Sequence, residues 1–112
     1  MTLTVPLSVI GLVLSLAPAW AADSSAEVDF LTRASNANLF AVEESRLALD
    51  RTRDSKLKAF ARQMVKDHGK AETELQAAAV GSGAAVPTRL DEEYQARLTA
   101  LQGRSGSDFD KA

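Results

Sequence analysis

Residues 55–83 read SKLKAFARQMVKDHGKAETELQAAAVGSG, and this stretch decides the fold class. Its core-type side chains recur in steps of three and four, the period of one face of an α-helix. That face comprises Leu57, Phe60, Ala61, Met64, His68, Ala71, Leu75 and Ala78, and a different face carries Lys58, Arg62 and Lys66. Asp54 or Ser55 is a good N-cap, and Gly81-Ser82-Gly83 ends the helix after about Val80. We expect the Phe60 ring to be buried, so that Phe60→Ala costs about 3–5 kcal/mol.

A second long helix is predicted before this stretch. Ser24-x-x-Glu27 has the form of a capping box, and helix-compatible sequence without Pro or Gly continues to about Thr52. The predicted core face comprises Phe30, Leu31, Ala34, Ala41, Val42, Ala48 and Leu49. Because Phe40 and Leu47 lie off this face, we expect a second neighbour there, either another helix or another subunit. The short link between the two long helices makes them antiparallel neighbours.

A third, shorter helix is predicted after the Gly-rich loop. Pro87 and Thr88 open it and Gly103 closes it. Its apolar stripe consists of Leu90, Tyr94, Leu98 and Leu101. Since no strand pattern occurs, the predicted fold class is all-α, an antiparallel helical bundle built from a long helix hairpin and a shorter third helix.

The last residues resemble the beginning of another helix. Ser107-x-x-Asp110 has the form of a cap and Phe109 is positioned to pack, but the sequence stops at Ala112 before that helix could form. Two interpretations are open, a truncated chain with an incomplete bundle and a frayed polar tail. A modest core of this size would gain from dimerisation or from further helices.

The N-terminal segment predicts export. Residues 5–20 carry no charge, and Ala19-Trp20-Ala21 places small residues where signal peptidase requires them. We therefore expect residues 1–21 to be a signal peptide, and residues 22–112 to form the domain in the periplasm or cell envelope. The alternative is an uncleaved anchor, which the short apolar run and its two prolines, Pro6 and Pro18, disfavour.

Composition excludes several functions. With 112 residues and a net charge of −2, the chain suits one small globular domain. Lys and Arg share their helices with Asp and Glu, so we expect no nucleic acid as a partner. Cysteine is absent, which excludes disulfides, thiolate metal sites and cysteine nucleophiles. One histidine and no cysteine leave no nucleophile and base pair typical of an enzyme.

A run of segments in a fixed order resembles a known family. The segments are Asp29-Phe30-Leu31, Ser45-Arg46-Leu47-Ala48-Leu49, Phe60-Ala61 to Asp67-His68, Glu74-Leu75 and Asp108-Phe109-Asp110. They resemble the exported bacterial family called domain of unknown function 4142 over nearly the whole mature chain, most specifically between Phe60 and His68. The resemblance implies a ferritin-like antiparallel bundle in the periplasm or outer-membrane fraction, and no established activity. Family members usually continue into two further helices with additional histidines, and they commonly carry a glutamate where this chain has Ala41.

The same resemblance directs attention to His68 as a candidate metal ligand. Metals in ferritin-like proteins lie inside the bundle on carboxylates and Glu-x-x-His pairs. His68 points to the centre of its stripe, and Glu72 lies one turn later on the same side. A further ligand would come from Glu44, from Glu43 or from a partner chain. The alternative is a histidine in the core with one hydrogen-bond partner and no metal.

Three classes of function remain at this stage. The first is a non-enzymatic envelope protein, related to interaction or stress, whose helices pair with themselves or with another envelope protein. Membrane association would be peripheral if it occurs at all. This first class implies no cofactor. The second is a ferritin-like protein that binds a divalent metal through His68, Glu72 and Glu44. The third, an enzyme, is limited to carboxylate or metal chemistry.

Overall fold

The computed structural model describes residues 24–112, which form four helices. They are α1 (Ser24–Arg51), α2 (Ser55–Ser82), α3 (Glu92–Gln102) and α4 (Gly106–Asp110). Residues 24–112 contain no strand, so the all-helical class is confirmed. No helix in this part of the chain is long and apolar enough to cross a membrane. The predicted signal peptide, residues 1–21, lies outside the described residues.

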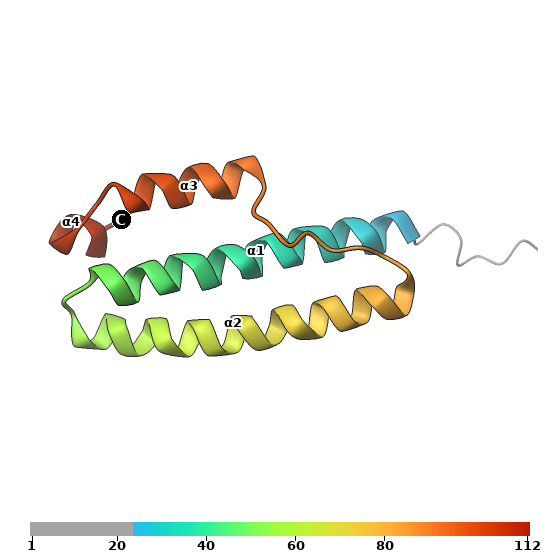
Figure 1. Ribbon diagram of the computed structural model, residues 1–112, viewed down its shortest axis with the longest axis horizontal. Helices are drawn as coiled ribbons and strands as arrows, with labels where there is room; N and C mark the ends of the chain where they lie inside the picture. The colour runs from blue at the N-terminus through green and yellow to red at the C-terminus, as the bar shows by residue number, and fades with distance from the viewer. Residues whose placement is uncertain (1–23) are drawn as a thin grey trace, which may run out of the picture.

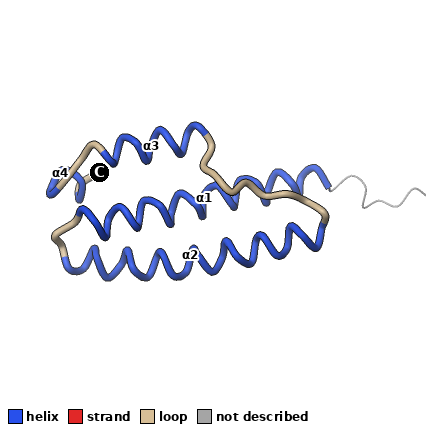
Figure 2. Tube along the Cα trace, in the orientation of Figure 1, coloured by secondary structure: helices blue, strands red, loops and turns tan. Residues whose placement is uncertain are grey.

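The helices are arranged around α1. Figure 1 shows α1 in the middle, with α2 antiparallel along one side and α3 on the other, and the tube in Figure 2 traces the same layer. Each of the other three helices packs against α1. The chain therefore forms a helical bundle in which α1 is the shared element and α2 and α3 flank it.

Local capping signals explain where α2 begins and where it ends. The Asp54 carboxylate accepts hydrogen bonds from the backbone N–H groups of Lys56 and Leu57, at 2.7 and 3.1 Å, and so caps α2. At its other end, Gly83 adopts a left-handed conformation with φ of 73°, which a glycine adopts without a steric penalty. The predicted bounds of both long helices are thus confirmed to within a few residues.

The third helix begins later than predicted. Pro87 and Thr88 do not open α3, because its N-cap is Asp91, whose carboxylate accepts a hydrogen bond from the backbone N–H of Tyr94 at 2.9 Å. The backbone N–H of Asp91 in turn donates to Asn36 Oδ1 on α1, also at 2.9 Å. This tertiary contact holds the segment before α3 against α1 in an extended path, and it explains the correction.

The fourth helix forms, contrary to the expectation that the sequence stops too early for it. It is a single short turn whose N-cap is Ser105 rather than Ser107. Phe109 on this turn is only 7% exposed, so the prediction that it packs is confirmed. The short helix α4 thus places the Phe109 ring against α1.

The buried face of α2 is rotated from the predicted one. Ala61 and Ala79, eighteen residues or about five turns apart, are each 2% exposed and face α1. Phe60 and Ala78 form the neighbouring line along α2, and both are exposed, Phe60 to 60%. The prediction that Phe60 is buried is therefore wrong. So is the assignment of Phe30 to the core of α1, since its side chain is 66% exposed.

The expectation of a second neighbour for α1 is confirmed for Phe40. Its ring meets the Tyr94 ring of α3 with centroids 4.9 Å apart and planes tilted by 30°. Offset or tilted aromatic pairs of this kind add about 0.5–1.5 kcal/mol to the burial of the rings. The neighbour is thus another helix of the same chain.

Candidate functional site

Polar side chains lie buried between the two long helices. Ser35 of α1 is completely inaccessible, and its Oγ lies 2.6 Å from Oε1 of Glu72 on α2. The same hydroxyl lies 3.1 Å from the carbonyl oxygen of Pro87, in the loop before α3. One hydroxyl hydrogen can serve only one of these acceptors at a time. Ser35 therefore links α1 with α2 and with the connecting loop, and no substrate can reach it as a nucleophile.

The Glu72 carboxylate is only partly satisfied. The residue is 8% exposed, and Oε1 accepts a second hydrogen bond from Gln76 Nε2 at 3.2 Å. Its other oxygen, Oε2, is buried and has no hydrogen-bond partner. A buried polar atom without a partner is costly, so Glu72 depends strongly on the two bonds that Oε1 makes.

His68 lies one turn before Glu72 on α2 and is half-buried. Its Nδ1 lies 2.6 Å from Asn38 Oδ1 on α1. Because a carbonyl oxygen can only accept, this contact requires a proton on Nδ1 and leaves Nε2 of the neutral ring as the atom with a free lone pair. This single hydrogen bond is what we expect of a histidine in the core that binds no metal. It is also compatible with a metal-binding histidine, because such a ring usually donates its other N–H to an oxygen of the protein.

The predicted metal ligands do not form a complete set. Glu72 is held by Ser35 and Gln76, His68 by Asn38, and Glu43 forms an ion pair with Arg46 at 3.0 Å. Glu44 projects into an open groove. Within residues 24–112, no three His, Cys, Asp or Glu side chains are grouped so that they could hold one ion. A metal on His68 would need ligands from outside this part of the chain.

Sequence reasoning missed the polar partners on α1, although a signal for them exists. Asn38, Ser45 and Thr52 follow one another at intervals of seven residues, which places them on one helix face. Ser45 and Thr52 are buried there, as is Ser35. Small polar residues repeating within an apolar stripe indicate a helix interface with internal hydrogen bonds.

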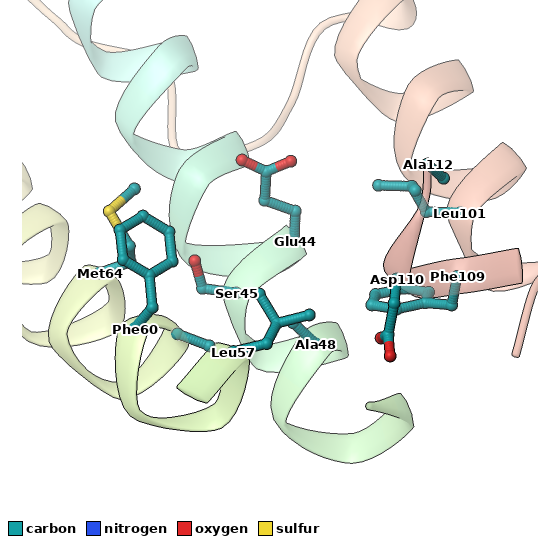
Figure 3. A pocket seen from close by; sticks show the side chains of 11 residues that line it. Glu44, Ser45, Ala48, Leu57, Phe60, Met64, Leu101, Phe109, Asp110 and Ala112 are labelled. Atoms are coloured by element: carbon teal, nitrogen blue, oxygen red, sulfur yellow. The ribbon is translucent and has the colours of Figure 1, made fainter. Parts of the chain in front are cut away.

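An open apolar groove lies beside this interface, near the turn that joins the two long helices (Figure 3). Its volume is about 230 Å³. Glu44, Ser45 and Ala48 of α1 form the floor, with side chains of α2 on one side and those of α3, α4 and the last residue of the chain on the other. The lining side chains on the two sides are Leu57, Phe60, Ala61 and Met64, and Leu101, Phe109, Asp110 and Ala112. A second hollow, lined by Phe40 and Arg97, shares Glu44 and Leu101 with the groove and extends it along α3.

Glu44 is the acidic group of the groove floor. Burial raises the pKa of its carboxyl above the ordinary value for glutamate, and the nearby His68 ring, when it is protonated, lowers the pKa by a smaller amount. No ion pair to Glu44 occurs within residues 24–112. The groove therefore combines apolar walls with two carboxylates, those of Glu44 and Asp110, and neither has an ion pair within residues 24–112.

The raised pKa of Glu44 predicts a pH-dependent effect of Glu44→Gln. An acid whose pKa is higher in the folded state destabilises the fold when ionised, and this cost disappears as the pH falls through the folded-state value. We expect Glu44→Gln to raise the free energy of unfolding at pH 7 and to leave it unchanged at about pH 3, below the ordinary value for glutamate. Urea unfolding at both pH values, at a concentration where the protein is a single chain, measures this, with the exposed Glu92→Gln as control. A gain that is the same at both pH values would contradict the assignment.

The comparisons with known proteins identify the family. Neither a curated protein nor a solved structure matches the chain. One family model matches residues 14–112, nearly the whole sequence, and it is described as "Domain of unknown function (DUF4142)". The resemblance seen between Phe60 and His68 is thereby confirmed at the level of the family. This protein belongs to the DUF4142 family.

Proposed function

We propose that this chain is an exported protein of the cell envelope, with a ferritin-like bundle, that acts by binding another helix and has no catalytic activity of its own. The groove between α2 and the end of α3 is the observation that carries this proposal. It is open, mostly apolar and rimmed by the exposed Phe60 ring. Apolar grooves beside a helix are typical docking places for the apolar face of an amphipathic helix.

Within residues 24–112, the two pairs that most resemble a reactive site favour a binding role. His68 is bonded to Asn38, and Ser35, which lies beside Glu72, is inaccessible. Neither pair offers the accessible nucleophile and base that hydrolytic or transfer chemistry requires. The uncharged segment from residue 5 to residue 20 supports export, which brings such a groove to partners in the envelope.

Export is tested by the form of the protein recovered from cells that express the full chain. We expect the protein in the periplasmic or envelope fraction, with a mass that begins at Ala22. A protein that begins at Met1 and remains with the cytosolic fraction would overturn this part of the proposal.

Binding at the groove is tested by cross-linking in the same cells. A photoreactive phenylalanine analogue at position 60 faces the groove. The same analogue at the exposed neighbour Ala59 lies about 100° further round α2 and points away from α1. We expect cross-linked adducts from position 60 and few from position 59. Equal yields from both positions would show that the groove has no preferred occupant.

A second candidate function is binding of a divalent metal through His68, Glu72 and Glu44. It is supported by the free lone pair on His68 Nε2 and by the partnerless Oε2 of Glu72. Because three ligands are not grouped within residues 24–112, a partner would have to supply the rest. Elemental analysis of protein purified without a histidine tag or chelator tests this. Stoichiometric iron, manganese or zinc that is lost in His68→Ala supports it, and metal-free protein excludes it.

A further inference from the structure

The groove belongs to a longer apolar face of the hairpin. On α1, Phe30 lies eighteen residues before Ala48, which places both on the same side of the helix. On α2, Phe60 and Ala78 have the same spacing and are both exposed. Ala48 and Phe60 line one groove, so these two lines of side chains share one side of the hairpin. Phe60 and Ala78 of the apolar stripe of α2 are therefore left uncovered within residues 24–112.

This face has a knob at one end and a hole at the other. The knob is the Phe30 ring near the start of α1, and its side chain is 66% exposed. The hole is the groove over Ala48, which at about 230 Å³ exceeds the roughly 150 Å³ of a cavity known to bind benzene. Ala34 and Ala37 lie between them, neither is fully buried, and their small side chains allow close approach of another helix. The two features are about 27 Å apart at about 1.5 Å per residue.

We propose that the occupant of the groove is a second copy of this chain, packed antiparallel on the hairpin so that Phe30 of each copy enters the groove of the other. This inference rests on the proposed helix-binding function and names its partner. A two-fold axis near the middle of the hairpin exchanges the two ends of the face, so one arrangement fills both grooves. Two hairpins packed in this way form a four-helix bundle, a common way to complete a core.

Charge supports the same pairing. Arg33 follows Phe30 by three residues, about 4.5 Å along the helix. In an antiparallel copy with Phe30 over Ala48, that displacement brings Arg33 level with Ser45 and next to Glu44. Among residues 24–112, Arg33 pairs only with the exposed Asp29, at 3.1 Å, and Glu44 has no ion pair. The second copy thus supplies the base that the Glu44 carboxylate lacks.

The first test is the mass in solution of the protein purified from cells that express the full chain. By light scattering at about 100 µM, we expect the mass of two chains. Phe30→Asp should reduce it to one chain without loss of helical content, since Phe30 is exposed within a single copy. Val28→Asp is the matched control, because Val28 is also exposed and lies near Phe30 but points to the other side of α1. It should leave the mass of two chains unchanged.

The second test is a charge exchange between the two copies. Arg33→Glu and Glu44→Arg should each weaken the association by about tenfold, as expected for a charge reversed at an interface. The variant that carries both changes restores an opposite pair at both ends of a two-fold dimer, and we expect its dissociation constant to return to within about threefold of the original. Only a partner with the same sequence can be rescued in this way.

The outcomes separate this inference from the proposed function. A mass of one chain at 100 µM would overturn the second copy as occupant. If position 60 still cross-linked to a different protein, the helix-binding function would stand without this inference. If position 60 gave no adducts above position 59, both would fall. A dimer that Phe30→Asp and Val28→Asp disrupt equally, or that the double charge exchange fails to restore, would overturn the proposed interface.

Discussion

Phe109→Ala is expected to lower the free energy of unfolding by about 3–5 kcal/mol, the usual cost of removing a buried phenylalanine ring. Phe109 is 7% exposed, and the ring packs beside α1 and Leu101 at the groove. Its removal leaves a cavity and takes away the one side chain that holds α4 in place. Urea unfolding followed by circular dichroism measures the change at a concentration where the protein is a single chain.

Phe60→Ala is the matched control for Phe109→Ala. Both changes remove the same ring, but Phe60 is 60% exposed, so little transfer free energy is lost. We expect a cost below about 1 kcal/mol within a single chain, as for most exposed substitutions. Equal costs for the two variants would mean that the groove is closed in solution or that α4 is not docked.

Ser35→Ala is the second change with a large expected effect. It removes the 2.6 Å hydrogen bond to Glu72 and leaves that buried carboxylate with Gln76 alone. Loss of one partner from a buried hydrogen bond costs about 1–3 kcal/mol, and more when the group left behind is charged. We therefore expect a loss of about 3 kcal/mol, in spite of the small change in side-chain volume.

A double variant separates the lost hydrogen bond from lost packing. When Ser35→Ala is combined with Glu72→Leu, no charge remains buried, and apolar replacements of buried polar pairs are often neutral or stabilising. The double variant should therefore be more stable than Ser35→Ala alone. If the two changes proved simply additive, the Ser35–Glu72 contact would carry no coupling energy and the interpretation would be wrong.

The sequence predicts best those features that depend on nearby residues. The bounds of α1 and α2 follow from the helix period and from the Asp54 and Gly83 caps, which act within a few residues of themselves. The start of α3 could not be predicted in the same way, because the contact of Asp91 with Asn36 spans 55 positions of the chain. Where α3 begins therefore depends on how the segment before it packs against α1.

The candidate site was predictable only in part. His68 was correctly singled out as a polar residue in the α2 stripe, but its partner Asn38 and the Ser35 contact of Glu72 are tertiary. The buried line of α2 runs through Ala61 and Ala79 rather than Phe60. The apolar stripe of α2 is wider than the surface that one neighbouring helix covers. The hydrophobic period alone cannot show which residues of such a stripe face that neighbour. The exposed half is the one from which the groove arises.

The central position of α1 also orders the ways in which the molecule can open. Every other helix packs on α1, while the loop between Gly83 and Asp91 is the covalent tie between the hairpin and α3. If α3 and α4 detach, α1 and α2 therefore stay packed together and keep the Ser35–Glu72 hydrogen bond. If α1 detaches, each of the other described helices loses its packing partner. We therefore expect amide hydrogens in α3 to exchange through a small local opening, and those in the middle of α1 to exchange only when the whole domain unfolds.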